Sequence, residues 1–333
     1  MLAPLRDVLA AERDRTVPSY VGVTRYLGGL AIAFFCLEVL TGILLMIYYR
    51  PSIGAAHLST AVIIDEVNLG WLVRSLHRRG ADFLLLLAAV HLFRVYLSRA
   101  YENPRQLTWA TGIFLALVFV AFDLTGVLLP WDQYAYWATD FLRQALAAIP
   151  IVGHMVVTIL WGGSDLAEAG LLRFYAFHIA VLPWVALVIL SVHVMTVWRF
   201  GLKRPAQGDG TGSPRLFYPD FLTDFFLAFL VILGLLMSAA IVFPVRLGPA
   251  ADPLSPLLAV LPRWYLMPLH QLLELVSSSV AAVVGGLALV VVFFLPALDA
   301  GTTESVRGRN VRVAIGVLVV AACVLLGVWG YRF

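Results

Sequence analysis

Four histidines occur as two pairs, each pair within a long apolar stretch of the sequence. His91 follows His77 at position i+14, and His193 follows His178 at position i+15. Fourteen residues of α-helix rise about 21 Å and return to within about 40° of the starting face. Each helix would therefore present two imidazoles on nearly one face, at two depths. A single histidine in an apolar helix is usually a hydrogen-bonded core residue, but two matched pairs favour metal ligation.

Imidazole is a common axial ligand of haem iron. Two such helices lying side by side would form two bis-histidine haem sites, stacked across a bilayer. The predicted topology pairs His77 with His178 near the outer face and His91 with His193 near the inner face. Two haems at two depths would carry electrons across a membrane.

The elements that must position these histidines are membrane-spanning helices. Of the 333 residues, 61% are hydrophobic and 13% are charged, and the mean hydropathy is +0.91. This composition predicts an all-α polytopic membrane protein. A span needs about 20 largely apolar residues. Seven stretches qualify, at residues 27–49, 81–97, 111–129, 177–198, 221–243, 272–294 and 313–329.

Residues 201–216 are rich in glycine and proline and predict a linker between two domains. Residues 1–205 would form a four-helix domain with all four paired histidines, and residues 206–333 a three-helix domain. Residues 149–161 are apolar but too short to span, which predicts an interfacial helix on the outer side. The distribution of lysine and arginine favours a cytoplasmic N-terminus. No cleavable signal peptide is apparent, and no basic cluster indicates nucleic-acid binding.

Glycines repeat the spacing of the histidines. Gly42 follows Gly28 at position i+14 in the first predicted span, and Gly126 follows Gly112 at i+14 in the third. Glycine lets a flat macrocycle edge approach a helix backbone, although small residues also serve helix packing in membranes. The topology assigns Gly28 and Gly112 to the inner haem. Gly42 and Gly126 are assigned to the outer haem.

Arginines next to the histidines could bind haem propionates, because a guanidinium holds a carboxylate through two parallel hydrogen bonds. Arg74 and Arg78 lie beside the first histidine of their helix, and Arg94 and Arg105 follow the second. Ordinary charge at a membrane boundary is the alternative. Propionate binding is favoured for Arg74 and Arg94.

The motifs around these residues resemble cytochrome b of the bc-type quinol oxidoreductases. They read GWLVRSLHR at 70–78, HLFRVYL at 91–97, PRQLTW at 104–109, LPWDQ at 129–133 and IPIVG at 149–153. The longer histidine spacing of the fourth span and the Pro-Trp-Asp-Gln motif are most similar to the cytochrome b6 branch. Residues from about Tyr218 onward resemble the separate three-helix subunit IV of that branch.

The resemblance implies a four-helix bundle with two b-type haems and a three-helix part. It implies a quinol:cytochrome c (or equivalent acceptor) oxidoreductase with two quinone sites. The outer site would oxidise quinol and divide its electrons between a Rieske iron–sulfur protein and the outer haem. The inner site would return electrons to quinone, so that protons move outward. The resemblance also implies three partners: a c-type cytochrome subunit, membrane lipid and a second copy of the complex. The implied location is a bacterial inner membrane.

Two positions depart from the family pattern. Related chains of the chloroplast branch carry a cysteine before Leu-Gly-Gly that tethers an extra c-type haem. Tyr26 stands there in this chain, and thioether attachment needs a thiol, so no covalent haem is expected. The outer-site motif Pro-Glu-Trp-Tyr has Arg263 in place of its glutamate, and Glu274 stands where related chains have arginine. This exchange predicts an Arg263–Glu274 ion pair; separate drift of the two positions is the alternative.

The expected quinol pocket comprises Tyr265, Trp131 and residues 149–161. Arginine cannot act as a general base at neutral pH, because its pKa stays above about 12. Another group must therefore accept the quinol proton. The candidates are Glu274, His270, His154 and Asp123. Imidazoles ordinarily titrate near neutral pH. For each residue taken individually, a structural hydrogen bond is the favoured interpretation.

Two further acids stand out. Glu38 lies within the first predicted span, where acids are rare unless they are paired or functional. Asp224 lies near the inner end of the fifth span and resembles an aspartate of the family's inner quinone site. The alternative for Asp224 is a favourable interaction with a helix N-terminus.

Two other functions stay open. A di-haem anchor could relay electrons between quinone and a different oxidoreductase without bifurcation, and Arg263 keeps this alternative open. A transporter or channel would need broken helices that meet at polar sites in the membrane, which the paired histidines and glycines do not favour. A haem spectrum separates the transporter from both redox functions. Co-purification of a Rieske subunit separates the two redox functions.

Overall fold

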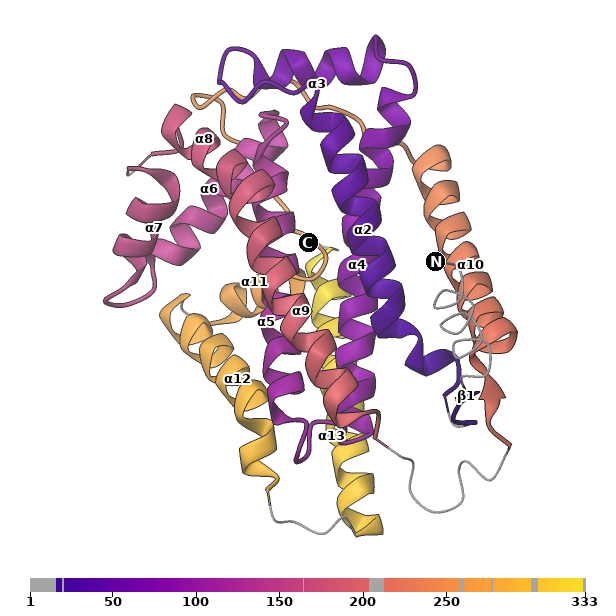
Figure 1. Ribbon diagram of the computed structural model, residues 1–333. Helices are drawn as coiled ribbons and strands as arrows, with labels where there is room; N and C mark the ends of the chain where they lie inside the picture. Colours follow the sequence, from indigo (N-terminus) through magenta and orange to yellow (C-terminus); the bar gives the residue numbers. More distant parts are fainter. Residues whose placement is uncertain are drawn as a thin grey trace. The chain divides into compact units, whose positions relative to one another are not determined.

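The computed structural model describes residues 16–19, 21–163, 165–203, 213–257, 260–276, 278–300 and 305–331. The described secondary structure is almost entirely helical (Figure 1). One short antiparallel sheet pairs β1 (Thr16–Val17) with β2 (Arg215–Leu216). Residues 204–212, which include the expected domain boundary and most of the expected linker, lie outside the described residues.

The chain divides into two compact units. The first unit lies within Met1–Leu45, Leu69–Ala100 and Gly201–Val245. The second lies within Met46–Asn68, Tyr101–Phe200 and Arg246–Phe333. Each unit therefore contains one of the two histidine pairs.

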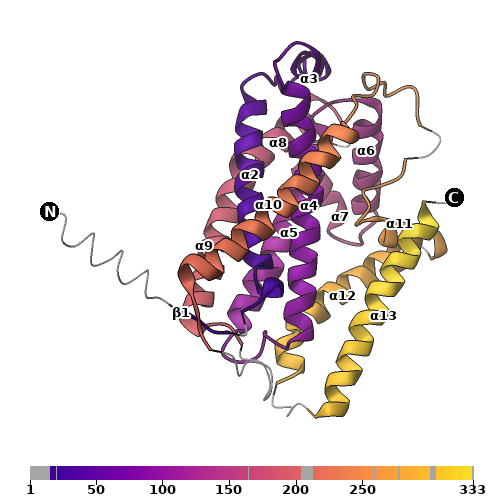
Figure 2. The ribbon, with the colours of Figure 1, turned by 90° about the vertical axis from the view of Figure 1, so that its right-hand side faces the viewer.

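The described long helices of the first unit are α2 (Leu27–Met46), α4 (Gly70–Leu97) and α10 (Leu222–Val242). A short helix, η1 (Val23–Arg25), precedes α2. A kinked segment, η3 (Phe217–Phe221), in which Tyr218 is extended, leads into α10. Figure 2 shows α2 and α4 alongside each other, with α10 crossing both. The fully buried Phe34 of α2 lies 6.2 Å from the ring of Phe83 on α4 and 6.0 Å from Phe229 on α10. This aromatic contact joins the three helices.

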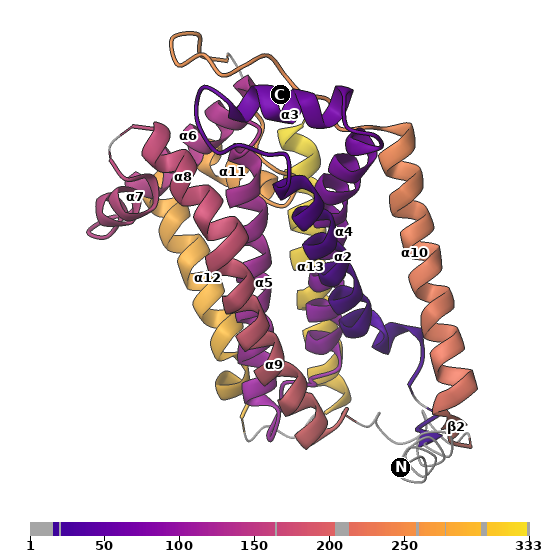
Figure 3. The same ribbon diagram turned by 45° about the horizontal axis from the view of Figure 1, so that its top comes forward.

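The second unit is built around α5 (Gln106–Leu128) and a long helix that packs along it. That long helix comprises α8 (Glu168–Ala176), the π turn η2 (Phe177–Val181) and α9 (Leu182–Phe200). Figure 3 shows α5 and α9 side by side. The remaining helices are α3 (Ala56–Asp65), α6 (Gln133–Ala147), α7 (Gly153–Trp161), α11 (Met267–Leu275), α12 (Ser278–Leu298) and α13 (Val306–Gly330).

The loop before α6 is held by buried side chains of the second unit. Trp131 is buried together with Trp161 and Phe174, whose rings lie 4.9 Å apart. Asp132 caps α6, because its Oδ1 accepts a hydrogen bond from the Ala135 amide at 2.8 Å. Its Oδ2 accepts another from the Gly248 amide at 3.1 Å. The Pro-Trp-Asp-Gln motif therefore fixes the start of α6 against the segment around residue 248.

Six helical stretches of the described chain are long and apolar enough to cross a membrane. They are Leu27–Met46, Gly70–Leu97, Gln106–Leu128, Glu168–Phe200, Phe217–Val242 and Val306–Gly330. Many side chains on α13 are apolar and exposed, including Leu318 (67%) and Leu325 (69%). Exposed apolar surface on this scale suits contact with lipid.

The single helix expected over residues 272–294 is wrong, because the structure has two helices there. α11 ends at Leu275, and Val276 is extended with φ −135° and ψ 163°. α12 then begins at Ser278. The expected interfacial helix at 149–161 is shorter than predicted and corresponds to α7.

Candidate functional site

In the first unit, each histidine of α4 lies against a glycine of α2. A Cβ atom at Gly28 would lie 3.1 Å from Cε1 of His91, and one at Gly42 would lie 3.2 Å from Cε1 of His77. Both distances are shorter than ordinary contacts, so these glycines make room for the imidazoles. The sequence suggested that they would face a macrocycle edge. In the structure the glycines contact the imidazole rings of His91 and His77.

The second unit repeats this arrangement between α5 and the long helix beside it. A Cβ atom at Gly112 would lie 3.3 Å from Cε1 of His193. One at Gly126 would lie only 2.8 Å from Cε1 of His178, which is too close for a real side chain. Each unit therefore contains two imidazoles backed by glycine, at the two positions that the spacing predicted along the helix.

Threonines fix the orientation of three of these imidazoles. Each lies directly before one of the glycines, and its Oγ1 is 3.0 to 3.1 Å from a histidine Nδ1. The pairs are Thr41 with His77, Thr111 with His193 and Thr125 with His178. Each hydroxyl also donates to a backbone carbonyl one turn earlier, at 2.7 to 2.9 Å.

This network assigns the histidine tautomer. A threonine hydroxyl has one proton, which is used on the carbonyl, so its oxygen must accept the Nδ1–H of the imidazole. Nε2 is then unprotonated and keeps its lone pair for a metal. Metal-bound histidines usually donate their other N–H in this way.

The donor set fits haem iron. Axial ligation needs a neutral imidazole with one free nitrogen, and the three threonine-bound rings supply it. Among the described residues, no group of three or more histidine, cysteine, aspartate or glutamate side chains could hold an isolated metal ion.

A π turn at η2 accounts for the unequal histidine spacings. The Leu182 amide bonds to the carbonyl of Phe177, five residues earlier, directly before Pro183. A π turn takes up one residue more than an α turn. His178 lies within this turn, so its longer spacing to His193 is equivalent to the i+14 spacing of a regular α-helix.

The four arginines expected near the haems have different surroundings. Arg74 is buried, and its Nη1 donates to the carbonyl of Val245 at 2.6 Å. Arg105 donates from Nη2 to the carbonyl of Phe200 at 3.4 Å. Arg78 and Arg94 are half-buried on α4. Binding of propionates by these side chains stays a prediction.

Arg263 pairs with Asp123, and the expected pair with Glu274 is wrong. The Arg263 Nε lies 3.0 Å from Oδ2 of Asp123 on α5. The Asp123 side chain is only 2% exposed. The Tyr265 hydroxyl donates to the same oxygen at 2.8 Å. Glu274 has no ion pair among the described residues. The sequence exchange suggested the wrong acid because Asp123 is 140 residues away along the chain.

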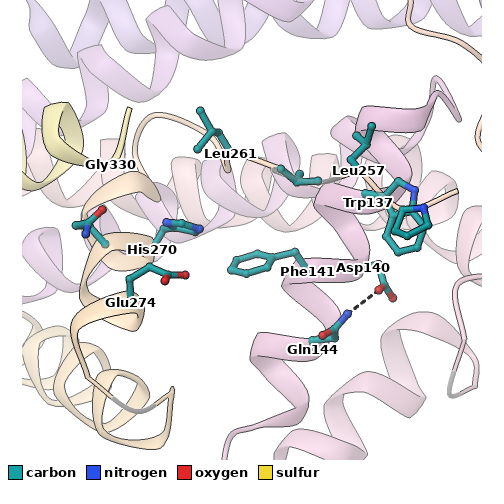
Figure 4. A pocket seen from close by; sticks show the side chains of 12 residues that line it. Trp137, Asp140, Phe141, Gln144, Leu257, Leu261, His270, Glu274 and Gly330 are labelled. Atoms are coloured by element: carbon teal, nitrogen blue, oxygen red, sulfur yellow. Dashed lines mark hydrogen bonds between the residues drawn. The ribbon is translucent and has the colours of Figure 1, made fainter. Parts of the chain in front are cut away.

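Glu274 instead lines a cavity of about 520 Å³ in the second unit. Figure 4 shows His270 and Glu274 of α11 on one side of it, with Phe141, Asp140 and Gln144 of α6 opposite. The other lining residues are Trp137, Pro256, Leu257, Val260, Leu261, Gln271 and Gly330. His270 and Glu274 are four residues apart on one helix, so they share a face. The cavity therefore combines apolar residues with three ionisable side chains, Asp140, His270 and Glu274.

His270 lies between this cavity and Arg263, since it lines two cavities. It also lines a smaller cavity of about 80 Å³, together with Arg263 and Phe141. Its Nδ1 is buried and has no hydrogen-bond partner among the described residues. An imidazole in this setting can form a new hydrogen bond with a ligand at no cost to an existing one.

The larger cavity differs from the expected quinol pocket. Its lining includes neither Tyr265 nor Trp131, nor any residue of 149–161. Tyr265 is directed to Asp123, and Trp131 packs against Tyr136 in the core. Burial and, to a smaller extent, Asp140 raise the pKa of Tyr136. His154 is exposed on α7.

Two other expected positions lie in the first unit. Asp224 binds Arg215, with 2.7 Å between Oδ2 and Nη2. The hydrogen bond to this carboxylate raises the pKa of Arg215. Tyr26 is buried, and its ring lies edge-on to Phe221 at 5.2 Å.

The cytochrome b/b6/petB family model matches residues 12–201 of the chain. The chain belongs to the cytochrome b/b6 family. A second family model, cytochrome b (C-terminal)/b6/petD, matches residues 250–333. One polypeptide therefore joins a cytochrome b6-like part to a petD-like part.

Curated relatives agree with this assignment. Cytochrome b6 of Picosynechococcus sp. is 41% identical over 192 residues, which are 58% of this chain and 86% of the relative. Cytochrome b6 of Rippkaea orientalis is 41% identical over 202 residues, or 60% and 91% of the two chains. Cytochrome b6 of Synechococcus elongatus is 40% identical over 192 residues, or 58% and 89%.

A solved structure of a hyperthermophilic respiratory Complex III has the same fold. Its TM-score is 0.88 at 24% identity, over 99% of this chain and 89% of that chain. The protein is thus an integral membrane protein of the cytochrome b/b6 family, whose members carry b-type haem.

The threonines are the candidate site residues that the sequence reasoning missed in this cytochrome b. A signal was present in the sequence, because Thr-Gly occurs at 41–42, 111–112 and 125–126. A threonine therefore precedes three of the four glycines that repeat the histidine spacing. Threonine in an apolar helix commonly bonds its own backbone. The side-chain contact became visible only once the neighbouring helix was in place.

Proposed function

We propose that this cytochrome b oxidises quinol on the outer side of the membrane and passes electrons inward through two b-type haems. The observation that carries the proposal is the glycine-backed imidazole, present twice in each unit. His77 and His178 would bind the outer haem, and His91 and His193 the inner haem. When bound, the haems supply one-electron transfer between the two sides of the membrane.

The residues around the histidines would prepare these sites. Thr41, Thr111 and Thr125 hold Nδ1–H and leave Nε2 free for iron. Arg74, Arg78, Arg94 and Arg105 would bind the propionates, for which a guanidinium is suited. This assignment is supported by the position of these arginines on or beside the histidine-bearing helices.

The quinol would occupy the cavity lined by His270 and Glu274. Oxidation of a quinol releases two electrons and two protons, and the electrons would go to a Rieske iron–sulfur centre and the outer haem. Asp123 already accepts hydrogen bonds from Arg263 and Tyr265. His270 and Glu274 border the cavity and are therefore the proposed proton acceptors. Arg263 would stabilise the residues beside the pocket through its ion pair with Asp123.

The wider arrangement follows from the same proposal. The chain would span the membrane seven times, with α12 as the additional span and a cytoplasmic N-terminus. Residues 1–205 would form the four-helix di-haem part and residues 206–333 the three-helix part. Asp224 would contribute to an inner quinone site. The expected partners are a Rieske protein, a c-type cytochrome and a second copy of the complex, in a bacterial inner membrane.

A di-haem relay to another oxidoreductase, without bifurcation, is the second candidate. One observation favours it: the outer motif presents Arg263, which is held by Asp123, where the family pattern has an acid. The haem sites would be the same in both functions. The two candidates therefore differ at the outer quinone site and in the partner proteins.

Purification from the native membrane, with identification of subunits and haem types, tests both candidates. The leading proposal expects two b haems per chain and a co-purifying Rieske subunit. Two b haems with a different oxidoreductase would favour the relay, and a protein without haem would contradict both. Because Tyr26 offers no thiol, the polypeptide is expected to show no haem staining after denaturing electrophoresis.

A further inference from the structure

The carboxylate of Glu38 lies against the imidazole of His77 in the first unit. Oε2 of Glu38 is 3.1 Å from Nδ1 of His77, and the Glu38 side chain is 11% exposed. Thr41, one helical turn further along α2, reaches the same nitrogen at 3.0 Å. The Nδ1–H of His77 is therefore placed between a hydroxyl and a carboxylate.

His178 of the second unit has a different second contact. Nδ1 of His178 lies 3.1 Å from the carbonyl of Phe122 in addition to Thr125. A backbone carbonyl is neutral, whereas an ionised carboxylate carries a full negative charge. The two axial ligands proposed for the outer haem thus differ in the charge of the group that accepts their proton.

Gly80 makes space for this carboxylate. It lies on α4, three residues after His77, and a Cβ atom there would overlap Oε1 of Glu38. Glycine weakens the interior of a helix, so a spatial requirement accounts for its presence at this position. Any side chain at residue 80 would move the Glu38 carboxylate. The contact between Glu38 and His77 therefore depends on both helices.

A carboxylate in this position changes what the imidazole does to a metal. A hydrogen bond from Nδ1–H to a negative oxygen makes Nε2 a more basic ligand. A nearby negative charge also opposes the addition of an electron to the iron. Both effects favour the oxidised over the reduced haem, and hydrogen bonding to the axial ligand is one of the means by which proteins set haem potentials.

We infer that Glu38 is a positioning residue that acts through His77 to lower the reduction potential of the haem bound there. This inference rests on the proposed function, since it takes His77 as an axial ligand. The haem at His77 then holds an electron less tightly than it would with a neutral partner on Nδ1. An electron that reaches this haem is thereby favoured to move on to the haem at His91.

Redox titration of the purified complex, monitored through the haem absorption bands, tests this inference. Glu38→Gln keeps an amide oxygen beside Nδ1 but removes the charge. We expect the potential of one haem to rise by at least about 59 mV, which is a tenfold change in a one-electron equilibrium. The other haem should keep its potential. A wild-type potential for both haems would overturn the inference, as would an equal shift of both.

Gly80→Ala provides the second variant, because it displaces the carboxylate without changing Glu38 or His77. It should raise the potential of the same haem. Gly234→Ala on α10 is the matched control, since nothing lies within 4 Å of a Cβ there, and it should leave both potentials unchanged. If Glu38→Gln does not retain both haems, the result with Gly80→Ala decides. Absence of b haem from the wild-type protein would instead contradict the proposed function.

Discussion

The guanidinium of Arg263 lies against the carboxylate of Asp123, with 3.0 Å between Nε and Oδ2. Asp123 is on α5, within a predicted membrane span, and Tyr265 donates a hydrogen bond to the same oxygen. The positive charge that departs from the family motif is therefore compensated locally. Asp140 also faces the larger cavity, but its carboxylate is bound by Arg143 and Gln144, which leaves His270 and Glu274 as the candidate proton acceptors there.

Asp123→Ala should destabilise the protein strongly, because Arg263 would lose its counterion in a buried position. Breaking a buried pair typically costs about 3–5 kcal/mol. Thermal unfolding of the detergent-solubilised complex measures the effect. The double variant Asp123→Asn with Arg263→Gln should be milder than Asp123→Ala, since neither group then carries a charge.

The exposed Arg215–Asp224 pair provides the control for this prediction. Its side chains are 39% and 42% exposed, and an exposed pair contributes little to stability because water and salt screen it. Arg215→Gln should therefore shift the unfolding temperature only slightly. Equal shifts in Arg215→Gln and Asp123→Ala would contradict the importance assigned to the buried pair.

Gly126→Ala should displace His178 and remove one b haem, because the new Cβ would lie 2.8 Å from the imidazole. Gly112→Ala should be tolerated better, since the corresponding distance to His193 is 3.3 Å. Pyridine haemochrome quantification measures the haem content of both variants. Gly234→Ala is again the control and should retain both haems. Full haem content in Gly126→Ala would count against the close contact with His178.

Thr111→Val should weaken haem binding by about tenfold, the lower end of the effect of removing a hydrogen bond to a metal ligand. Valine has nearly the shape of threonine but cannot accept the Nδ1–H of His193. Haem transfer to excess apomyoglobin measures the loss. Thr158→Val on the exposed face of α7 should transfer haem at the wild-type rate. Indistinguishable rates in the two variants would reject the orienting role of Thr111.

His270→Ala and Glu274→Gln should each slow quinol-dependent reduction of the outer haem by about 10²-fold, the usual lower range for loss of a proton-transfer group. Stopped-flow spectroscopy measures the rate while the spectrum checks that both haems are retained. Glu66→Gln, at an exposed acid after α3, should be unaffected. A normal rate in Glu274→Gln with a slow His270→Ala would assign the proton to the histidine. Normal rates in both would favour the di-haem relay.

The sequence was informative wherever one helix alone determines the geometry. Histidine and glycine spacings follow helical periodicity, so they could be recognised without any neighbouring element. The partner of Arg263 could not be found in this way, because it depends on which residue of α5 approaches position 263. The break after Leu275 was missed for a different reason. Val276 and Ser277 carry neither proline nor glycine, so the apolar stretch looked continuous.

The π turn at Phe177–Val181 gives the long helix of the second unit freedom to vary in length. Loss of one residue from this turn, such as Ala180, would convert it to an α turn and give His178 and His193 the same spacing as His77 and His91. Both imidazoles would keep their faces, because the π turn already contains the extra residue. Descendants of this gene could thus gain or lose a codon here without losing either ligand. Deletion of one residue from α9 between Pro183 and His193 would instead rotate His193 away from Gly112.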